Sequence, residues 1–390
     1  MEYRNVKENE IDQVIKIKDY CFLNAYAGKR LEDFKYWAEV STIVGAFDHE
    51  ALAGQIVILP LAMNIHGQQY QMGGIGFVAT YPEYRNSGIM KQLIKSSLEK
   101  MREQQQWVSV LGPFSVSFYR HFGWELFFDK IHYEVSMHQL SAKKENMGRI
   151  IRFNYEDGRE YLEDVKKLYH QYTLSTNGVM VRDEAWWKRL EMRDPDVSFA
   201  LSLDEEGTPQ GYIRYVKKGQ TLSLLDQVAF NIKAEQSLWE FIKTHRSNFT
   251  TVTGLAAVQD SFGTQWDEPQ FKQEILHDKM IRIVDVEEFL KVYPFNETTS
   301  PLYLNVTDKF APWNQGIYEI HSHRVTKRTN EEVRRESCLE MDISSLSAYL
   351  AGYHDLNWYH YHKKARADKE VINKWDKAVP NESPRFYEHF

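Results

Sequence analysis

The stretch from Ile75 to Trp124 decides the fold, and it begins Ile75-Gly76-Phe77-Val78-Ala79-Thr80-Tyr81-Pro82-Glu83-Tyr84-Arg85-Asn86-Ser87-Gly88-Ile89-Met90. Its pattern predicts an apolar strand, a loop around Gly88, a helix over Ile89–Met101 and a second strand over Val108–Leu111. A loop that leads directly into a helix N-terminus presents unpaired N–H groups at the positive end of the helix dipole. The sequence therefore predicts an anion site that suits a phosphate.

The same stretch ends in Ser117-Phe118-Tyr119-Arg120-His121-Phe122-Gly123-Trp124, which places Tyr119 just after the second strand. The ordered set of strand, loop, helix, strand and tyrosine resembles the GNAT superfamily of N-acetyltransferases. The pyrophosphate signature of that family is Arg/Gln-x-x-Gly-x-Gly/Ala. Here it reads Arg85-Asn86-Ser87-Gly88-Ile89-Met90, with methionine in place of the last small residue. The resemblance implies N-acetyltransferase activity with acetyl-CoA as the cosubstrate.

The resemblance assigns the cofactor contacts to three segments. The end of the first strand would lend its backbone groups to the pantetheine arm. The loop would bind the pyrophosphate through backbone N–H groups, and a glycine there lets the backbone approach closely. Two more contacts would follow the second strand. The three segments are Val78, Ala79 and Thr80; Arg85, Asn86, Ser87, Gly88, Ile89, Met90 and Lys91; and Phe114 and Ser115.

Tyr119 is the candidate general acid. A phenol with an ordinary pKa of ~10 stays protonated at neutral pH and can give its proton to a departing thiolate. The residues alone equally allow an ordinary aromatic side chain that packs on the sheet, and the resemblance favours the catalytic role. Neither Cys21 nor Cys338 lies near a motif, so we expect direct attack by the amine without an acyl-enzyme.

Length and pattern predict a multidomain protein of the α/β and α+β classes. With 390 residues, the chain is more than twice as long as one such domain requires. The first unit, residues 1–138, is expected to hold the acetyl-CoA site, a helix over Ile11–Phe22 and strands at 42–47, 52–59, 61–65, 70–79 and 131–135. The polar stretch Gln139–Arg149 is typical of a linker.

A second α/β unit is predicted over residues 150–285. Its strand at Leu222–Phe230 leads into a helix at Ala234–His245, but the intervening Asn231-Ile232-Lys233 contains no glycine. A pyrophosphate could not approach that backbone closely, so we interpret this unit as a degenerate copy that binds no cofactor. Residues 286–390 are predicted to form an α+β unit with helices at 287–293 and 343–351 and a small sheet between them.

Three units in this order, with the signature in the first, resemble the Eis family of acetyltransferases. That family joins tandem GNAT folds, each a mixed sheet with helices, to a C-terminal domain like sterol carrier protein 2. The resemblance covers the whole chain. It implies that the acceptor is the primary amine of a polycationic small molecule, in the manner of an aminoglycoside, and that the protein forms a homo-hexamer built as a trimer of dimers.

In the Eis family the general base is the carboxylate of the chain's own C-terminus, which assigns this role to Phe390. A base is needed because an amine with a pKa of ~10 is mostly protonated at pH 7. The apolar last residue of Pro384-Arg385-Phe386-Tyr387-Glu388-His389-Phe390 is typical of a tail that folds inward. A tail that only packs is the alternative. Glu388 is a candidate charge partner for a cationic substrate, and a solvated charge at the rim is its alternative.

Charge and composition narrow the partners. The net charge of −7 argues against non-specific binding of nucleic acid. No run of 18 apolar residues and no apolar leader are present, so we expect no membrane association and no secretion. Two distant cysteines fit a reducing cytoplasm. The histidine pairs 321/323 and 360/362 lack a nearby Cys or Asp that would complete a ligand set, so no metal is expected.

Two other functions stay open from the sequence. In the first, the enzyme class is the same and the acceptor is a protein lysine or a peptide N-terminus. In the second, the chain is a lipid- or ligand-binding protein whose acetyltransferase site is vestigial. The intact loop and Tyr119 weigh against the second function.

Overall fold

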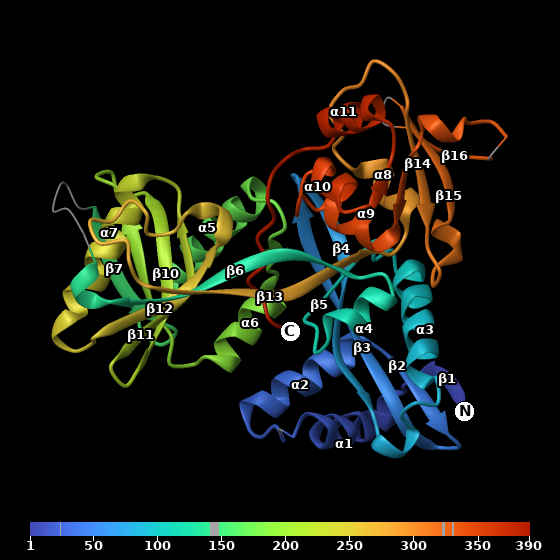
Figure 1. Ribbon diagram of the computed structural model, residues 1–390. Coiled ribbons are helices and arrows are strands. Elements are labelled where there is room, and N and C mark those ends of the chain that lie inside the picture. Colours follow the sequence, from blue (N-terminus) through green and yellow to red (C-terminus); the bar gives the residue numbers. More distant parts are fainter. Residues whose placement is uncertain (24, 141–147, 322–323, 330) are drawn as a thin grey trace. The chain divides into compact units, whose positions relative to one another are not determined.

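The computed structural model describes residues 1–23, 25–140, 148–321, 324–329 and 331–390 (Figure 1). Contacts divide the chain into two compact units: unit 1 is Met1–Phe128, Thr176–Val181 and Asp278–Phe390, and unit 2 is Asp129–Ser175 and Arg182–His277. Most of the predicted linker, residues 141–147, lies outside the described residues, as does His323. The domain ranges 1–138, 150–285 and 286–390 stay predictions, because a division by contacts follows compactness alone.

Unit 1 contains a mixed sheet in the order β1-β2-β3-β4-β5-β13. The strands are β1 (Glu2–Asn5), β2 (Thr42–Asp48), β3 (Ala51–Ile65), β4 (Gln68–Thr80), β5 (Val108–Leu111) and the last part of β13 (Lys272–Ile283), and β8 (Met180–Val181) pairs with β3. Pairing is antiparallel except between β4 and β5, which are parallel. The helix α3 (Ile89–Glu103) joins this parallel pair. The predicted break at Pro60 is wrong, because Pro60 stays paired with Gly73 in one long β3.

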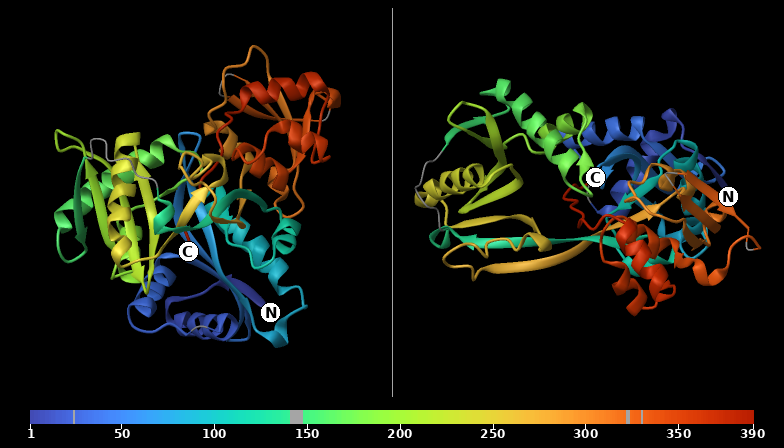
Figure 2. Two further views of the ribbon diagram at one scale, coloured as in Figure 1. Left: turned by 60° about the vertical axis from the view of Figure 1, so that its left-hand side comes forward. Right: turned by 90° about the horizontal axis from the view of Figure 1, so that it is seen from above.

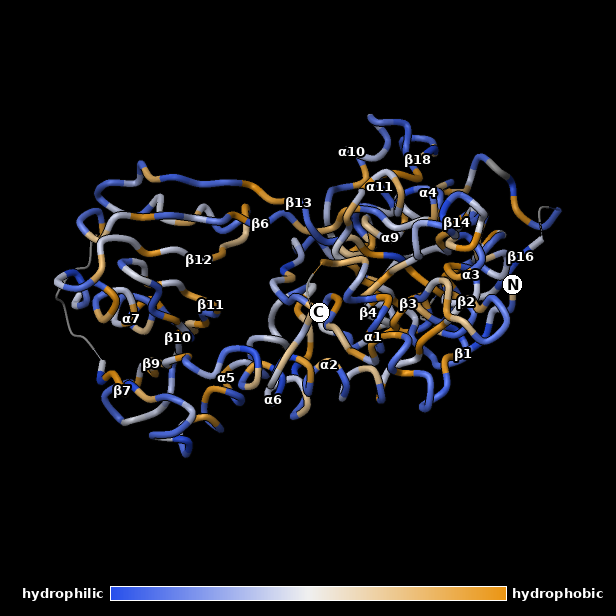
Figure 3. The backbone as a smooth tube through the Cα atoms, turned by 90° about the horizontal axis from the view of Figure 1, so that it is seen from below, coloured by the Kyte–Doolittle hydropathy of each residue, from blue (hydrophilic) through white to orange (hydrophobic). Residues whose placement is uncertain are grey.

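Helices cover both faces of this sheet. Ile56 and Ile58 of β3 pack in one cluster with α3, whereas Gln55 donates to the Val14 carbonyl of α1 (Ile11–Phe22) at 3.4 Å. Helix α2 (Lys29–Val40), which the sequence pattern did not predict, also packs on β3. The apolar residues concentrate along these strands (Figure 3). The residues predicted to face inward from α3 are all buried: Ile89, Leu93, Ile94 and Leu98.

The C-terminal part of unit 1 forms a second sheet, in the order β16-β15-β14-β17-β18. Its strands are β14 (Leu302–Thr307), β15 (Gly316–His321), β16 (Arg324–Arg328), β17 (Leu339–Asp342) and β18 (Ala365–Arg366), accompanied by the helices α8 (Val286–Val292), α9 (Ile343–Leu350), α10 (Leu356–Tyr361) and α11 (Lys369–Ala378). The last two helices fall in a stretch for which no structure was predicted. Beyond Pro380 the chain has no helix or strand, and its end lies beside the strands of the first sheet (Figure 2).

Unit 2 is built around a sheet in the order β6-β12-β11-β10-β9-β7. Its elements are β6 (Glu125–Ser136, entering from unit 1), β7 (Arg149–Asn154), α5 (Leu162–Ser175), α6 (Glu184–Arg193), β9 (Ser198–Leu203), β10 (Pro209–Lys218), β11 (Thr221–Ala229), α7 (Ile232–Thr244) and β12 (Thr251–Ala257). Strands β11 and β12 are parallel and α7 joins them, which repeats the β4–α3–β5 arrangement of unit 1. In the described part of the chain, no helix is long and apolar enough to span a membrane.

Candidate active site

Strands β4 and β5 begin as parallel neighbours and then separate. They pair over Met72–Ile75 and Val108–Leu111, and β5 ends there. Strand β4 continues to Thr80 and stays paired with β3 on its other side. Its last five residues therefore have backbone groups on one side that β5 does not use, as the predicted pantetheine contacts at Val78, Ala79 and Thr80 would require.

A bulge in β4 lies at the point of separation. The register shifts between Gln55 and Val57 of β3, because β4 carries one more residue than β3 between the matching pairs. Phe77 occupies the bulge with φ +49°, a left-handed value that is uncommon outside glycine, and its carbonyl accepts from the Gln55 side chain at 3.4 Å. A bulge of this kind bends a strand and re-aims the residues that follow, and it lies just after the last residue of β4 that pairs with β5.

The predicted phosphate loop connects β4 to α3. Gly88 is the N-cap of α3 with φ +82°, and no side chain caps this helix. Asn86 is also left-handed, at φ +62°. No atom lies within 4 Å of the position a Cβ on Gly88 would occupy, so the space above the helix N-terminus is open. The first N–H groups of α3 can thus donate to an anion, as the sequence predicted.

Two contacts of this loop differ from the expectation. The N–H of Arg85 is not a free donor, because it closes the short helical turn Pro82–Tyr84 by donating to the Pro82 carbonyl at 3.2 Å. The Arg85 Nε instead donates to the Thr80 carbonyl at 3.1 Å, which fixes the loop to the end of β4. The Ser87 hydroxyl donates to the Tyr84 carbonyl. These side chains stabilise the loop conformation and leave the N–H groups after Arg85 as the candidate phosphate donors.

Tyr119 lies on α4 (Val116–His121), a short helix that follows β5. The Ser115 hydroxyl caps this helix by accepting from the Phe118 N–H, and the Phe114 ring is largely exposed at 5.6 Å from the Tyr119 ring. Tyr119 itself is 3% exposed, and burial raises the pKa of its hydroxyl above the ordinary value. The hydroxyl therefore keeps its proton throughout the neutral range.

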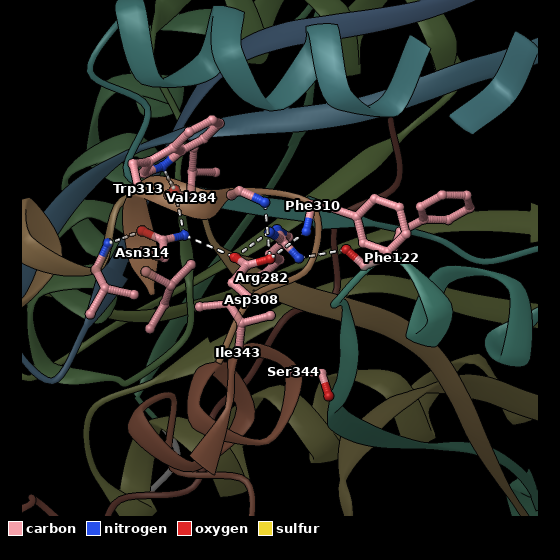
Figure 4. Close-up of polar contacts among 12 residues, drawn as sticks. Phe122, Arg282, Val284, Asp308, Phe310, Trp313, Asn314, Ile343 and Ser344 are labelled. Atoms are coloured by element: carbon pink, nitrogen blue, oxygen red, sulfur yellow. Dashed lines mark hydrogen bonds and ion pairs between the residues drawn. The ribbon is translucent and has the colours of Figure 1, made fainter. Parts of the chain in front are cut away.

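A buried ion pair anchors the end of α4 (Figure 4). Arg282 of β13 is 0% exposed and donates to the Phe122 carbonyl at 2.5 Å and to Asp308 at 2.6 Å. A Cβ on Gly123 would overlap the Arg282 guanidinium, so only glycine fits beside it. Asp308 also accepts from the Asn314 side chain at 3.0 Å. The loop after β14 thus holds, through Arg282, the helix that carries Tyr119.

The C-terminal tail reaches the point where β4 and β5 separate. Its ring contacts follow the start of β6: Phe386 lies 5.8 Å from Phe127, and Tyr387 lies 5.2 Å from Phe128. The Phe390 ring would be 3.0 Å from a Cβ on Gly74, and a carboxylate oxygen of Phe390 would be 3.9 Å from a Cβ on Gly76. Gly74 and Gly76 lie on either side of the last β4 residue that pairs with β5. The terminal carboxylate is therefore next to the divergence of the strands.

The residues around the tail end include buried charges. Glu388 is 7% exposed, so the alternative that it is a solvated rim charge does not hold. His389 approaches Gly112, the residue after β5, with its Cε1 4.0 Å from where a Cβ would lie. The Nζ of Lys279 would lie 3.9 Å from the same Cβ, and it donates to Asp278 at 3.2 Å. A carboxylate-bearing tail thus enters a region that already holds a buried lysine and its acidic partner.

Sequence reasoning missed the glycine that makes room for the tail. A Cβ on Gly74 of β4 would lie 3.0 Å from the Phe390 ring, and glycine inside a strand marks close approach of another backbone or a ligand. That signal was available. The roles of Gly112, Lys279 and Arg282 had no local signal, because they depend on β13, a strand that was not predicted.

The loop and strand geometry fit a nucleotide cosubstrate with a pyrophosphate and an extended arm. The open, uncapped N-terminus of α3 suits the phosphates, and the unpaired side of β4 suits the arm. For metals, the described residues contain no group of three or more His, Cys, Asp or Glu side chains placed to hold an ion.

Comparison with known proteins agrees with this geometry. Models of an acetyltransferase (GNAT) domain match residues 2–127 and 178–283, and a model of a sterol carrier protein domain matches residues 286–387. An uncharacterized N-acetyltransferase of Streptomyces avermitilis is 22% identical over 84% of both chains. A solved structure from Enterococcus faecalis V583, described as a "Probable N-Acyltransferase", is 25% identical over 100% of this chain and 99% of its own, with a TM-score of 0.90.

The fold is also that of Eis1 from Mycobacterium abscessus, which is 17% identical over 100% of both chains with a TM-score of 0.82. The predicted architecture of tandem GNAT folds followed by a domain like sterol carrier protein 2 is confirmed. The chain belongs to the GNAT N-acetyltransferases and has the Eis-like arrangement of two acetyltransferase domains and a C-terminal sterol carrier protein domain.

Proposed function

We propose that this N-acetyltransferase transfers the acetyl group of acetyl-CoA to a primary amine of a small polycationic molecule, with Tyr119 as general acid and the Phe390 carboxylate as general base. The observation that carries the proposal is the placement of the last residue. A carboxylate oxygen of Phe390 lies 3.9 Å from the Cβ position of Gly76, where β4 leaves β5.

The proposed roles follow the flow of protons. Acetyl-CoA supplies an acyl group on a thioester, in which the C–S bond breaks as the new C–N bond forms. The Phe390 carboxylate takes a proton from the ammonium acceptor, because an amine with a pKa of ~10 is mostly protonated at pH 7. Tyr119 gives its proton to the departing sulfur, and its burial keeps the hydroxyl protonated until then. The second proton that the nitrogen loses as the C–N bond forms restores the Tyr119 hydroxyl.

Cosubstrate binding is assigned to the first acetyltransferase domain. The N–H groups of Asn86 to Lys91 would hold the pyrophosphate, and the unpaired side of β4 from Val78 to Thr80 would hold the arm. Phe114 and Ser115 would line the entrance beside α4. Glu388 is proposed to attract the cationic acceptor, and the net charge of −7 favours the same class of substrate.

The acceptor class rests on the resemblance to the Eis family, together with the acidic chain. The same resemblance supports a cytoplasmic location and a homo-hexamer built as a trimer of dimers. Light scattering of the purified protein tests the oligomeric state directly.

A panel of acceptors tests the proposed activity. Purified protein is incubated with acetyl-CoA and with aminoglycosides, polyamines or lysine-containing peptides, and release of the CoA thiol is measured. Thiol release with the small polycations, and its loss in Tyr119→Phe, is the expected result. Release with lysine peptides alone would move the acceptor to proteins. No release with any amine, together with lipid carried through purification, would favour the ligand-binding alternative.

A further inference from the structure

Asn177 is fully buried and joins three segments of unit 1. Its side-chain Oδ1 accepts from the His66 N–H at 2.9 Å, and its Nδ2 donates to the carbonyls of Ala351 at 2.8 Å and Glu382 at 2.6 Å. Asn177 lies in the short segment Thr176–Val181, which packs with unit 1 although the chain on both sides of it belongs to unit 2. An asparagine with every side-chain polar group in use at 0% exposure has a demanding structural role.

The third of these segments is the C-terminal tail, and the Asn177 backbone holds it as well. The Asn177 carbonyl accepts from the Arg385 N–H at 2.8 Å, and its N–H donates to the Glu382 carboxylate at 3.2 Å. The tail from Asn381 to Phe390 contains no helix or strand, so its own secondary structure does not fix its course. Asn177 therefore supplies a fixed point five residues before the terminal carboxylate.

Gly178 lets the tail lie directly against this segment. It has φ +80°, and a Cβ there would be 2.6 Å from the Cβ of Pro384 and 2.8 Å from the Arg385 nitrogen. Real Cβ atoms do not approach other atoms so closely, and the left-handed backbone itself favours glycine. Any other residue at position 178 would push the tail away.

The segment that holds the tail is itself fixed to the sheet of the active site. Asn64 of β3 donates its N–H to Val179 and accepts from the Gly178 N–H, both at 2.8 Å. Two residues further, Met180 pairs with Met63 of β3. Strand β3 is the neighbour of β4, which carries Gly74 and Gly76 under the Phe390 ring and carboxylate. The anchor and the terminus are thus built on adjacent strands.

We propose that Asn177 and Gly178 are positioning residues that hold the C-terminal tail, so that the Phe390 carboxylate stays where β4 and β5 separate. The proposal rests on the role of Phe390 as general base. The anchor lies in the short segment Thr176–Val181, between two stretches of chain that belong to unit 2.

Two substitutions test the anchor from different sides. Asn177→Asp keeps the shape but places a carboxylate oxygen against the carbonyls of Ala351 and Glu382. Gly178→Ala inserts one methyl group between the segment and Pro384. Gly207→Ala is the matched control, because Gly207 has a similar φ of +86° and no atom within 4 Å of its Cβ position. The control carries the same backbone strain without a collision.

Both test variants should free the tail and misplace the carboxylate. Hydrogen exchange of residues 382–390 should become faster, and kcat should fall ~10²-fold while KM for acetyl-CoA changes less than about twofold, because a displacement of about 1 Å has effects of this size. Deleting Phe390 in either variant should lower kcat no further, since both changes remove the same group. Gly207→Ala should leave exchange and kcat at the wild-type values.

The outcomes separate this proposal from the one on which it rests. Unchanged exchange of the tail in folded Asn177→Asp and Gly178→Ala proteins would overturn the anchor. Faster exchange with wild-type kcat would support the anchor and refute the role of Phe390 as base. If Asn177→Asp does not fold, Gly178→Ala alone decides whether the anchor exists, because it only adds one methyl group at the contact with the tail. Additive losses of kcat with the Phe390 deletion would also overturn the proposal.

Discussion

The two acetyltransferase domains contain the same strand–helix–strand arrangement but begin their helices in opposite ways. In the first, Gly88 begins α3 in a left-handed conformation, with no side-chain cap and open space above it. In the second, Asn231 begins α7 with φ −152°, and its side chain accepts from the Ala234 N–H at 2.9 Å. A helix N-terminus that is capped by its own chain has less to offer a phosphate.

The elements that follow differ as well. After β5 the first domain has α4 with Tyr119, whereas after β12 the second has the short turn Val258–Asp260 and no tyrosine before β13. The tail also approaches Gly74 and Gly76 of the first domain. The comparison teaches that a fold can be repeated without the features proposed for its chemistry, because the phosphate loop, the proposed acid and the proposed base are separate additions to the sheet.

The largest expected effect is on the acid of the first domain. Tyr119→Phe keeps the ring and removes the proton donor, so kcat should fall ~10²–10⁴-fold, the range for general acid–base catalysis. Steady-state and single-turnover assays measure this loss. Tyr133→Phe is the matched control, because Tyr133 is 1% exposed, lies in β6 within unit 2, and has a hydroxyl without a hydrogen-bond partner among the described residues.

The pH profile adds a second check on Tyr119. Burial raises the pKa of its hydroxyl above the usual ~10, so the proton is retained at and below that pH and is lost only at higher pH. Wild-type kcat should therefore show no decline from deprotonation of this group between pH 7 and 9. A Tyr119→Phe protein with wild-type single-turnover rates would show that Tyr119 is not the general acid.

Moving the terminal carboxylate should have the next largest effect. Deleting Phe390 retracts the carboxylate by about 3.3–3.6 Å along an extended chain, which is too far for direct proton transfer. A short polar extension after Phe390 replaces the carboxylate by a neutral amide. Both changes should lower kcat ~10²-fold or more and leave acetyl-CoA binding intact. An extension at the N-terminus is the control, and equal rates for both extended proteins at pH 6–9 would rule out the carboxylate as base.

A change in the phosphate loop should have a smaller effect, confined to the binding of acetyl-CoA. Gly88→Val places a side chain in the open space above α3, where it meets no protein atom but would meet a bound pyrophosphate. The KM for acetyl-CoA should rise about tenfold or more, equivalent to a loss of about 1.4 kcal/mol in binding. Gly219→Val controls for backbone strain, since Gly219 has φ +56° and equally open surroundings. Unchanged affinity in Gly88→Val would show that the loop binds something else.

The smallest effect is expected at the helix N-terminus of the second domain. Asn231→Ala removes the cap of α7 and should lower the stability of that domain by about 1 kcal/mol, the usual value of such a cap. Activity should not change. Titration calorimetry should find one acetyl-CoA per chain in the wild type and in Asn231→Ala. A second bound acetyl-CoA would show that the second domain also binds the cosubstrate.

The sequence alone determined those helices and strands whose apolar residues recur at a regular spacing. The spacing of apolar residues predicted α3, whose inward residues are buried as expected, and the strands β2 and β5. The phosphate loop and Tyr119 could also be found, because a loop, a helix N-terminus and the residue after a strand are local features. Helix α2, β12 and β13 were missed, since their apolar residues gain a regular arrangement only through contacts distant in sequence.

Only the tertiary structure decided how the site is assembled. The divergence of β4 from β5, the Arg282–Asp308 pair behind α4 and the anchor at Asn177 join residues up to 205 positions apart. Hydrogen bonds and close packing depend on positions in space, and a linear pattern carries no record of them. The C-terminal residue could be named from the sequence by resemblance, but the close approach of its ring to β4 depends on Gly74, where a Cβ would lie 3.0 Å from that ring.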